Sequence, residues 1–442
     1  MIKAGTGAAE GGAGGIAALP DGALVEVFSR VRDVEALFRC ATTTKRWLRL
    51  FTDPGFLRLF WPETDRARLR GLFLKGPDGN MRRIFVPRPE SPLGLEDSSR
   101  ITSLVLNDHE DERDLLASSR GVILKHIFTS TCCMGSHTDI VLSDPITGAV
   151  DKFAPPPGCR CLRVDVAGHA ILTAADVGDL NRVRRPPSIR QHTTSQMLLI
   201  GRHQDDQRLH QHLHAYSGVT GCWSAAATIR HHSRLRMTGA RAGVVHQGAA
   251  HWLYRDETID FSLPQDKRDL YMITATAATG RVSLTKLPIQ AAGGLPYVCV
   301  GRDGRLSVAC VHNMRVDVWT QQDEDDTSLA AWLLSQMSGK NWLLSQVIQM
   351  PSTAPANENF MSFKWFYFNK GAMMAVYGGN GVFVLDLETK AMEKIMDLSD
   401  CAPSYGYYMC VPYEMDLPEF FLGQLGGLAI EGDSEVGWRW PW

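Results

Sequence analysis

Apolar residues recur with the period of an α-helix near the start of the chain, over residues 19–61. Four of them stand at positions i, i+3, i+4 and i+7 and so share one face of a first predicted helix: Leu24, Val27, Phe28 and Val31. A second set has the same spacing and predicts a second helix: Val34, Leu37, Phe38 and Ala41. The pattern therefore predicts two amphipathic helices in succession.

Polar residues define where these helices begin and end. Asp33 is a suitable N-cap for the second helix, with Glu35 in the first turn, where a carboxylate is favoured. Residues 42–44 are three threonines, whose hydroxyls compete for backbone hydrogen bonds and break the helical run. A third helix should end at Asp53, because the residue before a proline is disfavoured in the helical conformation. One further short apolar turn follows at 56–61.

Beyond residue 70 the helical period gives way to short runs of Val, Ile, Leu and Phe separated by turn residues, which is typical of β-strands. The clearest runs are 71–75, 84–86, 101–106, 122–127 and 140–142. Four longer segments share one layout of strand, turn and second strand: 140–153, 214–226, 270–287 and 382–395. At each turn Gly or Lys follows a threonine, where a positive φ or an exposed polar residue is wanted. These segments predict recurring β-hairpins.

The spacing of the hairpins leaves two architectures open. Their tips are unevenly spaced along the chain and fit no single short repeat: Thr147, Thr220, Thr279 and Thr389. Degenerate β-propeller blades with uneven insertions would give this spacing, and so would a pair of irregular β-sandwiches. Three tryptophans also lie in strand-like runs, where an indole can fill the gap between packed sheets: Trp252, Trp319 and Trp365.

The helical segment is too small to bury all of its apolar side chains by itself. Of its 43 residues, 19 are Leu, Val, Phe, Trp or Cys, and units of about 40–80 residues rarely stand alone without a disulfide, a metal or a partner. If about six side chains remain outside at about 1.5–3 kcal/mol each, about 10 kcal/mol of burial is unused. Such a surface normally meets another protein. The alternative is an ordinary helical bundle covering the rest of this chain, because apolar helical stripes are usually core.

Several short motifs in this segment resemble the F-box family. The matching positions are, in chain order, Leu19-Pro20, Val27-Phe28, Val31, Asp33-Val34, Leu37, Arg39-Cys40, Lys45-Arg46-Trp47 and Asp53-Pro54. The resemblance is specific over residues 19–61, is especially close to F-box proteins of grasses, and continues more loosely to about Asp416. Three positions depart from the usual family pattern: Gly22-Ala23, Arg32 and Thr44. Of these, Gly22 costs about 1 kcal/mol if it lies inside a helix.

This resemblance implies a role in an SCF ubiquitin ligase. F-box helices dock on the Skp adaptor and through it on a cullin, so the same partners are implied here, together with an unidentified target protein. The β-domain would then present loops to that target, as the C-terminal β-domains of the family do. We expect eleven residues to make up the surface and core of the F-box, without assigning each side chain to one or the other: Leu19, Pro20, Leu24, Val27, Phe28, Val31, Val34, Leu37, Phe38, Trp47 and Phe51.

The balance of charges and the placement of the cysteines narrow the classes of protein and the compartments that fit this sequence. The chain carries 46 basic and 48 acidic side chains, a balance that argues against binding to nucleic acid or an anionic membrane. The ten cysteines show no C-x-x-C spacing and no N-x-S/T sequon occurs, which fits a cytoplasmic or nuclear protein. Every apolar run is shorter than the stretch of roughly 20 residues that crosses a bilayer as a helix, so no membrane span is expected. Residues 1–18, rich in Gly and Ala, predict a disordered arm and not a signal peptide.

Candidate chemistry in the β-region is weak. His210, His212 and His214 alternate and would share a strand face; three imidazoles can hold zinc, but no fourth ligand is evident and a solvated group is expected. Residues 378–381 are expected to form a hairpin turn, and the acidic residues of 108–114 a mixed-charge loop. No nucleophile elbow, Walker loop or dinucleotide-binding glycine motif occurs. We therefore expect no catalytic residue, metal or cofactor.

Two further features lie in the C-terminal third of the chain. The motif WLLSQ at 332–336 recurs at 342–346 and is expected to lengthen a surface helix or loop. Three tryptophans separated by single residues end the chain and would close the β-domain, form an exposed docking strip or be disordered: Trp438, Trp440 and Trp442.

The sequence thus predicts an α+β multidomain chain with four parts: a disordered arm (1–18), a small helical F-box domain (19–62), a large mainly-β, propeller-like substrate-recognition domain (63–425) and a Trp-rich tail (426–442). The favoured function is a non-catalytic substrate receptor. Two alternatives stay open. The β-domain could bind a small molecule or glycan, with ligase assembly secondary, or it could carry an enzyme site dispersed along the sequence.

Overall fold

The structure is a computed structural model of the whole chain. It describes residues 19–31, 33–61, 69–75, 84–88, 112–119, 121–131, 135–146, 150–154, 156, 165–173, 176, 194–205, 208–218, 220–225, 227–229, 235–256, 269–277, 279–289, 294–312, 315–322, 342–350, 364–377, 381–398 and 409–431. The predicted arm at 1–18, the strand at 101–106, the first WLLSQ copy and the final tryptophans lie outside the described residues.

Four short helices make up the N-terminal helical unit: α1 (Asp21–Ser29), α2 (Val34–Thr43), α3 (Lys45–Leu50) and α4 (Pro54–Phe60). The prediction that Asp33 caps the second helix is confirmed, because its side chain accepts a hydrogen bond from the backbone N–H of Glu35 at 2.9 Å. Thr44 caps α3 in the same way through the N–H of Trp47 at 3.1 Å. The starts of α2 and α3 are therefore both fixed by a local side chain.

The third helix is shorter than expected. It ends at Leu50 and not at Asp53. Asp53 instead caps α4 by accepting a hydrogen bond from the N–H of Phe56 at 2.7 Å, and Pro54 takes the first helical position. Proline is favoured there because its missing N–H has no intrahelical partner to lose.

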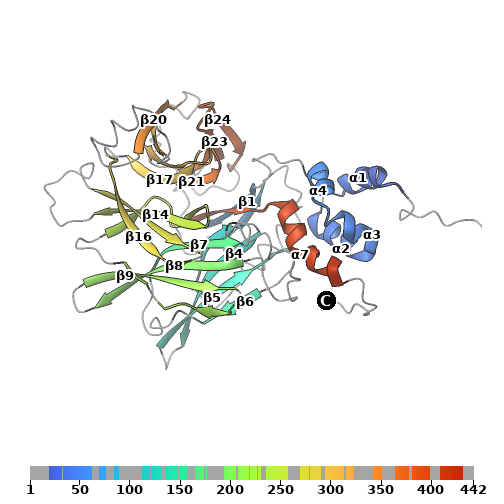
Figure 1. Cartoon of the computed structure of the whole chain (residues 1–442), viewed down its shortest axis with the longest axis horizontal. Helices are drawn as coiled ribbons and strands as arrows, with labels where there is room; N and C mark the ends of the chain where they lie inside the picture. Colours follow the sequence, from blue (N-terminus) through green and yellow to red (C-terminus); the bar gives the residue numbers. More distant parts are fainter. Residues whose placement is uncertain are drawn as a thin grey trace, which may run out of the picture.

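The strands form six antiparallel sheets, and their succession along the chain defines a six-bladed β-propeller (Figure 1). Blade 1 comprises β2 (Ile84–Pro87), β1 (Leu69–Lys75) and β25 (Met409–Glu414). Blade 2 comprises β3 (Glu112–Ser119), β4 (Val122–Thr131), β5 (Gly135–Ser143) and β6 (Val150–Phe153). Blade 3 comprises β7 (Asp165–Thr173), β8 (Thr194–Asp205), β9 (Arg208–Ser217), β10 (Cys222–Trp223) and β11 (Ala227–Ile229).

The other three blades follow in order. Blade 4 comprises β12 (Leu235–Thr238), β13 (Val244–His246), β14 (Ala249–Asp256), β15 (Leu270–Thr276) and β16 (Val282–Leu287). Blade 5 comprises β17 (Leu295–Val300), β18 (Leu306–Val311), β19 (Arg315–Gln321) and β20 (Trp342–Gln349). Blade 6 comprises β21 (Lys364–Asn369), β22 (Ala372–Tyr377), β23 (Gly381–Asp386) and β24 (Met392–Met396). The mainly-β, propeller-like prediction is confirmed, and the β-sandwich alternative is wrong.

The four predicted hairpins are the strand pairs β5–β6 in blade 2, β9–β10 in blade 3, β15–β16 in blade 4 and β23–β24 in blade 6. Three of the expected turn residues have a positive φ: Gly221 at 67°, Gly280 at 62° and Lys390 at 60°. The widest interval between hairpin tips, from Thr279 to Thr389, spans two blades. The last two strands of blade 5, β19 and β20, pair with each other but are separated by residues 322–341, so they are not joined by a short turn. Uneven insertions therefore explain why no single repeat length fits.

Both ends of the strand region meet in blade 1. β25 pairs with β1 in an antiparallel register in which Phe73 faces Val411. The backbone N–H of Gly121, in blade 2, donates to the carbonyl of Glu414 at the end of β25. In the same way, the backbone N–H of Gly371, in blade 6, donates to the carbonyl of Val300 at the end of β17, which is the first strand of blade 5. β25 thus takes the place of a first strand and closes the ring.

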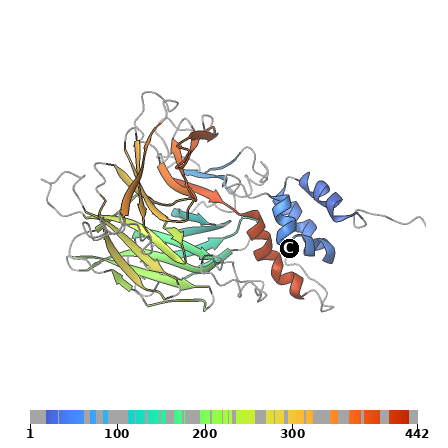
Figure 2. The same ribbon diagram turned by 45° about the horizontal axis from the view of Figure 1, so that its top comes forward.

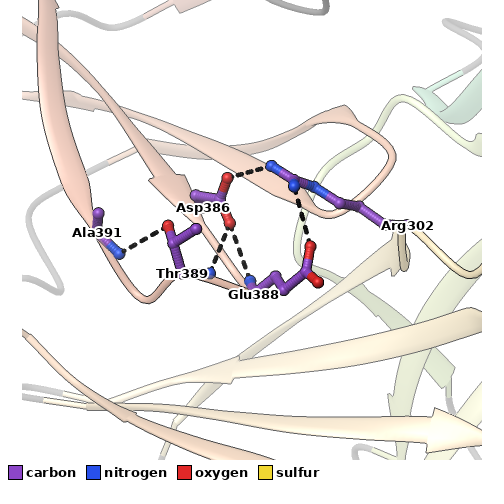
Figure 3. A network of polar contacts seen from close by, with 5 residues as sticks. All are labelled: Arg302, Asp386, Glu388, Thr389 and Ala391. Atoms are coloured by element: carbon purple, nitrogen blue, oxygen red, sulfur yellow. Dashed lines mark hydrogen bonds and ion pairs between the residues drawn. The ribbon is translucent and has the colours of Figure 1, made fainter.

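Neighbouring blades are also joined by ion pairs (Figure 3). Arg302, in the turn after β17, pairs with Asp386 and with Glu388 of blade 6, the second contact at 2.9 Å. Asp386 also accepts hydrogen bonds from the backbone N–H groups of Glu388 and Thr389 at 3.0 and 2.9 Å, which fixes the turn before Lys390. The guanidinium of Arg302 thereby ties blade 5 to blade 6.

A helix that the sequence analysis does not predict, α7 (Leu417–Glu431), follows β25 directly. It occupies residues assigned above to the end of the β-domain and the start of the tail. In both views it lies between the strands and the N-terminal helical unit (Figure 1, Figure 2). It contacts α3 and α4. The helical unit is therefore joined to blade 1 twice, because α4 precedes β1 in the chain and α7, which packs on the unit, follows β25.

Two smaller expectations are also corrected. The second WLLSQ copy forms strand β20 and not a helix or loop, because it pairs with β19 along its length. Residues 112–114 of the expected mixed-charge loop lie on strand β3. Within the described residues, no helix is both long and apolar enough to cross a membrane.

Candidate functional site

Aromatic side chains build the interior of the N-terminal helical unit. Phe51 is fully buried and lies against Phe28 and Phe56, with ring centroids 5.1 and 5.5 Å apart. Phe28 also makes an edge contact with Trp47 at 5.2 Å. Phe28 lies on α1, Trp47 on α3, Phe51 directly after α3 and Phe56 on α4, so the rings fix how these three helices pack.

The same interior continues into α7. Phe421 stacks on Phe51 at a centroid distance of 5.3 Å and an interplanar angle of 28°. It also contacts Trp61 at 5.1 Å and Phe38 at 5.9 Å. Phe420 reaches Phe38 at the same distance of 5.9 Å. The α7 helix therefore covers one apolar face of the helical unit from within the same chain.

The structure separates the eleven sequence-predicted residues into three groups. Six are buried in the core shared with α7 and blade 1: Leu24, Phe28, Val34, Leu37, Phe38 and Phe51. Four are partly exposed: Leu19, Val27, Val31 and Trp47. Pro20 is exposed. These five residues, the accessible face, keep some exposed surface, and α7 covers part of the apolar surface that the N-terminal helices leave open.

Val27 has a particular place in that face. Leu19, Val31 and Trp47 still pack against the shared core, whereas Val27 does not belong to that cluster. Leu59 on α4 is the most exposed large apolar residue among those described, at 76%. Sequence spacing places Val27 and Phe28 side by side and gives no indication that one is accessible and the other buried.

Polar contacts tie the accessible face together. The guanidinium of Arg46, on α3, donates to the carbonyl of Leu19 at 2.6 Å and pairs with the carboxylate of Asp21. This contact joins the start of α1 to α3, with the whole of α2 lying between them in the sequence. Because both charged side chains are substantially exposed, the pair contributes at most about 1 kcal/mol. Its role is to fix the Leu19-Pro20 entry into α1.

A buried polar group lies where the propeller meets the helices. Arg70, on β1, is 6% exposed, and burial lowers its pKa to about 10 despite the nearby Tyr413 and Asp416. The amide of Gln424, on α7, donates to the carboxylate of Asp144 in blade 2 at 3.4 Å. Because Asp144 is itself buried, this hydrogen bond gives its carboxylate a partner from α7 and links blade 2 to that helix.

The three alternating histidines lie on β9 as predicted. His212 and His214 have ring centroids 6.4 Å apart, and the hydroxyl of Thr228 is 3.3 Å from Nδ1 of His212. Burial lowers the pKa of His214 to about 4, so it is neutral at physiological pH. His214 is buried, which differs from the solvated group expected from the sequence. Within the described residues, no group of His, Cys, Asp and Glu side chains is arranged to hold a metal ion.

A second polar cluster, on blade 5, has no sequence signal that we recognised. Cys310 faces Asp317 across strands β18 and β19, and Nε2 of His312 is 3.0 Å from a carboxylate oxygen of Asp317. These are the residue types of a cysteine nucleophile site. Burial and the adjacent Asp317 raise the pKa of the Cys310 thiol to about 12, so no thiolate is available at neutral pH. The cluster is therefore a polar contact between strands in which the thiol is held protonated.

Comparisons with known proteins identify no relative by sequence. No family model matches the chain, and no curated protein matches it. Among solved structures, TolB from Acinetobacter baumannii has a TM-score of 0.38 and 8% identity over 79% of this chain and 67% of that one. The β-propeller domain of the Trilobed protease from Pyrococcus furiosus has a TM-score of 0.34 and 7% identity over 66% and 71%. The WD40 domain of SCAP from fission yeast has a TM-score of 0.34 and 8% identity over 67% and 57%. None of these likenesses carries an argument about function.

Proposed function

We propose that the chain is an F-box substrate receptor of an SCF-type E3 ubiquitin ligase. The observation that carries the proposal is the coincidence of the motif set in residues 19–61 with a unit of four short helices at one end of a β-propeller. In this proposal the helical unit docks on a Skp-type adaptor and through it on a cullin. The propeller recruits the target protein.

In this proposal the eleven predicted residues have two roles, which follow their burial. The six buried residues hold the helices together and do not touch the adaptor. The accessible face, made of Leu19, Pro20, Val27, Val31 and Trp47, takes the adaptor contact. Because four of these residues are already partly buried, docking would gain only part of the about 1.5–3 kcal/mol that full burial of a large apolar side chain provides.

The receptor itself is not a catalyst in this proposal. It holds a target near a ubiquitin-charged enzyme and raises the rate of lysine modification by proximity. Propeller loops are suited to binding the target, because connecting segments on a rigid scaffold carry most recognition residues. Assembly with a cullin ligase would take place in the cytoplasm, the nucleus or both.

The test replaces an accessible residue and leaves the core intact. Val27→Asp, at a partly exposed residue that does not belong to the shared core, should abolish pull-down of a Skp-type adaptor, because the carboxylate would be desolvated at the contact. The matched control is Leu344→Asp on β20, an equally drastic change at a residue that is 46% exposed and lies on blade 5. It should bind like the unmodified chain.

Circular dichroism checks that both variants remain folded. Undiminished adaptor capture by the Val27→Asp variant would reject the assigned face. Failure of the unmodified chain to capture any Skp-type adaptor would reject the proposed function itself. A pair of substitutions at Phe28 and Leu37 is a poorer test, because these residues are 2% and 1% exposed and their loss would damage the shared core.

A further inference from the structure

The α7 helix completes the interior of the N-terminal helical unit. Phe421 and Leu425 are fully buried in one cluster with Leu24, Phe51 and Leu57. That cluster also includes Phe73 on β1 and Tyr413 on β25 of the propeller. Since a unit of about 40 residues is marginal by itself, α7 supplies a substantial part of its stability.

The position of α7 depends on closure of the ring. β25 ends at Glu414 and α7 begins at Leu417, so only Met415 and Asp416 separate the closing strand from the helix. Of these, Met415 is fully buried, and its side chain fills the space beside Gly121 in blade 2. The short connection therefore fixes the position of α7 relative to β25, so that pairing of β25 with β1 also places α7 against the helical unit.

Polar contacts fix the direction in which α7 leaves the ring. The carboxylate of Asp416 accepts a hydrogen bond from the backbone N–H of Glu419 at 3.0 Å, which caps the start of the helix. One turn beyond Phe421, Gln424 donates to Asp144 in blade 2. The hydroxyl of Tyr413 donates to the carbonyl of Gly121 at 3.2 Å, which holds the end of β25 against the same blade.

From these contacts we propose that α7 couples the stability of α1–α4 to closure of the propeller ring. The docking helices are fully stable only when the last strand of the ring has joined blade 1. The meaning of this coupling for ligase assembly rests on the proposed function: an unclosed propeller would not present a competent docking unit. The coupling itself does not depend on that function.

Hydrogen exchange on the full chain, without any adaptor, tests the coupling. Phe421→Asp places a charge in the shared core while leaving the pairing of β25 untouched. We expect the protection of amides in α2 and α3 to fall about 100-fold or more, because loss of a buried aromatic side chain destabilises its surroundings to that degree. Leu59→Asp is the matched control, because Leu59 is exposed on α4, and protection there should match the unmodified chain.

Amides of β14 and β15 in blade 4 report whether the ring itself stays folded. If Phe421→Asp lowers their protection as well, the milder Phe421→Ala is measured in the same way. A second variant, Val411→Pro, removes a backbone donor from β25 and opens blade 1, and it should lower protection in α2 and α3 as Phe421→Asp does.

Two results would overturn the inference. One is unchanged protection of α2 and α3 in the Phe421 variants. The other is unchanged protection of α2 and α3 in Val411→Pro when the amides of β1 have become exposed. An adaptor that fails to bind the unmodified chain would count against the proposed function alone, since neither measurement involves an adaptor.

Discussion

The stack of Phe51 on Phe421 joins the first part of the chain to the last, and its strength can be measured with a double-mutant cycle. Both rings are fully buried, with centroids 5.3 Å apart and planes 28° apart. Substitution of either ring by leucine keeps most of the volume and should cost less than about 1.5 kcal/mol. Aromatic pairs contribute about 0.5–1.5 kcal/mol beyond their burial, so the double variant should lose that much less than the sum of the single variants.

The assay is urea unfolding of the unmodified chain, Phe51→Leu, Phe421→Leu and the double variant, followed by near-ultraviolet circular dichroism. The control cycle pairs Phe51→Leu with Met373→Leu, because Met373 is fully buried in a separate cluster between blades 5 and 6. That cycle should be additive within about 0.5 kcal/mol. A coupling between Phe51 and Phe421 below about 0.3 kcal/mol, or one no larger than the control, would refute the role assigned to the stack.

Further predictions concern a turn residue and a buried base. Lys390 has a φ of 60°, where a side chain is disfavoured, so Lys390→Gly should raise the free energy of unfolding by up to about 1 kcal/mol. Gly280 has a φ of 62° and open space around it, so Gly280→Ala should lower the free energy of unfolding by a similar amount. Thermal unfolding of both variants checks that the two effects have opposite signs. Burial lowers the pKa of His169 to about 3, so between about pH 6.5 and pH 4 the unfolded chain binds a proton that the folded chain does not. The free energy of unfolding contributed by His169 should therefore fall by about 1.4 kcal/mol per pH unit on acidification through that window and stay constant above it. His169→Leu should make the pH dependence correspondingly shallower in urea titrations from pH 4 to 7, and an unchanged slope would contradict the assignment.

Local signals in the sequence predicted the parts of the fold that depend on neighbouring residues. Asp33 caps a helix, and positive φ angles occur at Gly221, Gly280 and Lys390, because each depends on contacts within a few residues. Hairpins at the ends of the blades were predictable for the same reason. The blade count was not, because insertions obscure the repeat and one blade is assembled from both ends of the strand region.

The α7 helix shows why the rest was not predictable. Three glycines, at 423, 426 and 427, give its sequence a poor helix propensity, and packing against the helical unit outweighs that preference. A start signal was present in Asp416 and Glu419, three positions apart with Pro418 between them, which is the pattern of a capped helix N-terminus. The exposure of Val27 beside the buried Phe28 could not be read from spacing, because it depends on where α7 and blade 1 cover the helices.

Because α7 is synthesised late, the N-terminal helices of the nascent chain wait for the helix that covers them. About 360 residues separate Trp61 from Phe421, so at about 5–20 residues per second a ribosome needs about 20–70 s to make the second after the first. Throughout that interval the aromatic face around Phe38, Phe51 and Trp61 lacks the helix that covers it. Nascent chains of this protein should therefore depend on chaperones that bind exposed aromatic segments, and the dependence should end once α7 has left the exit tunnel.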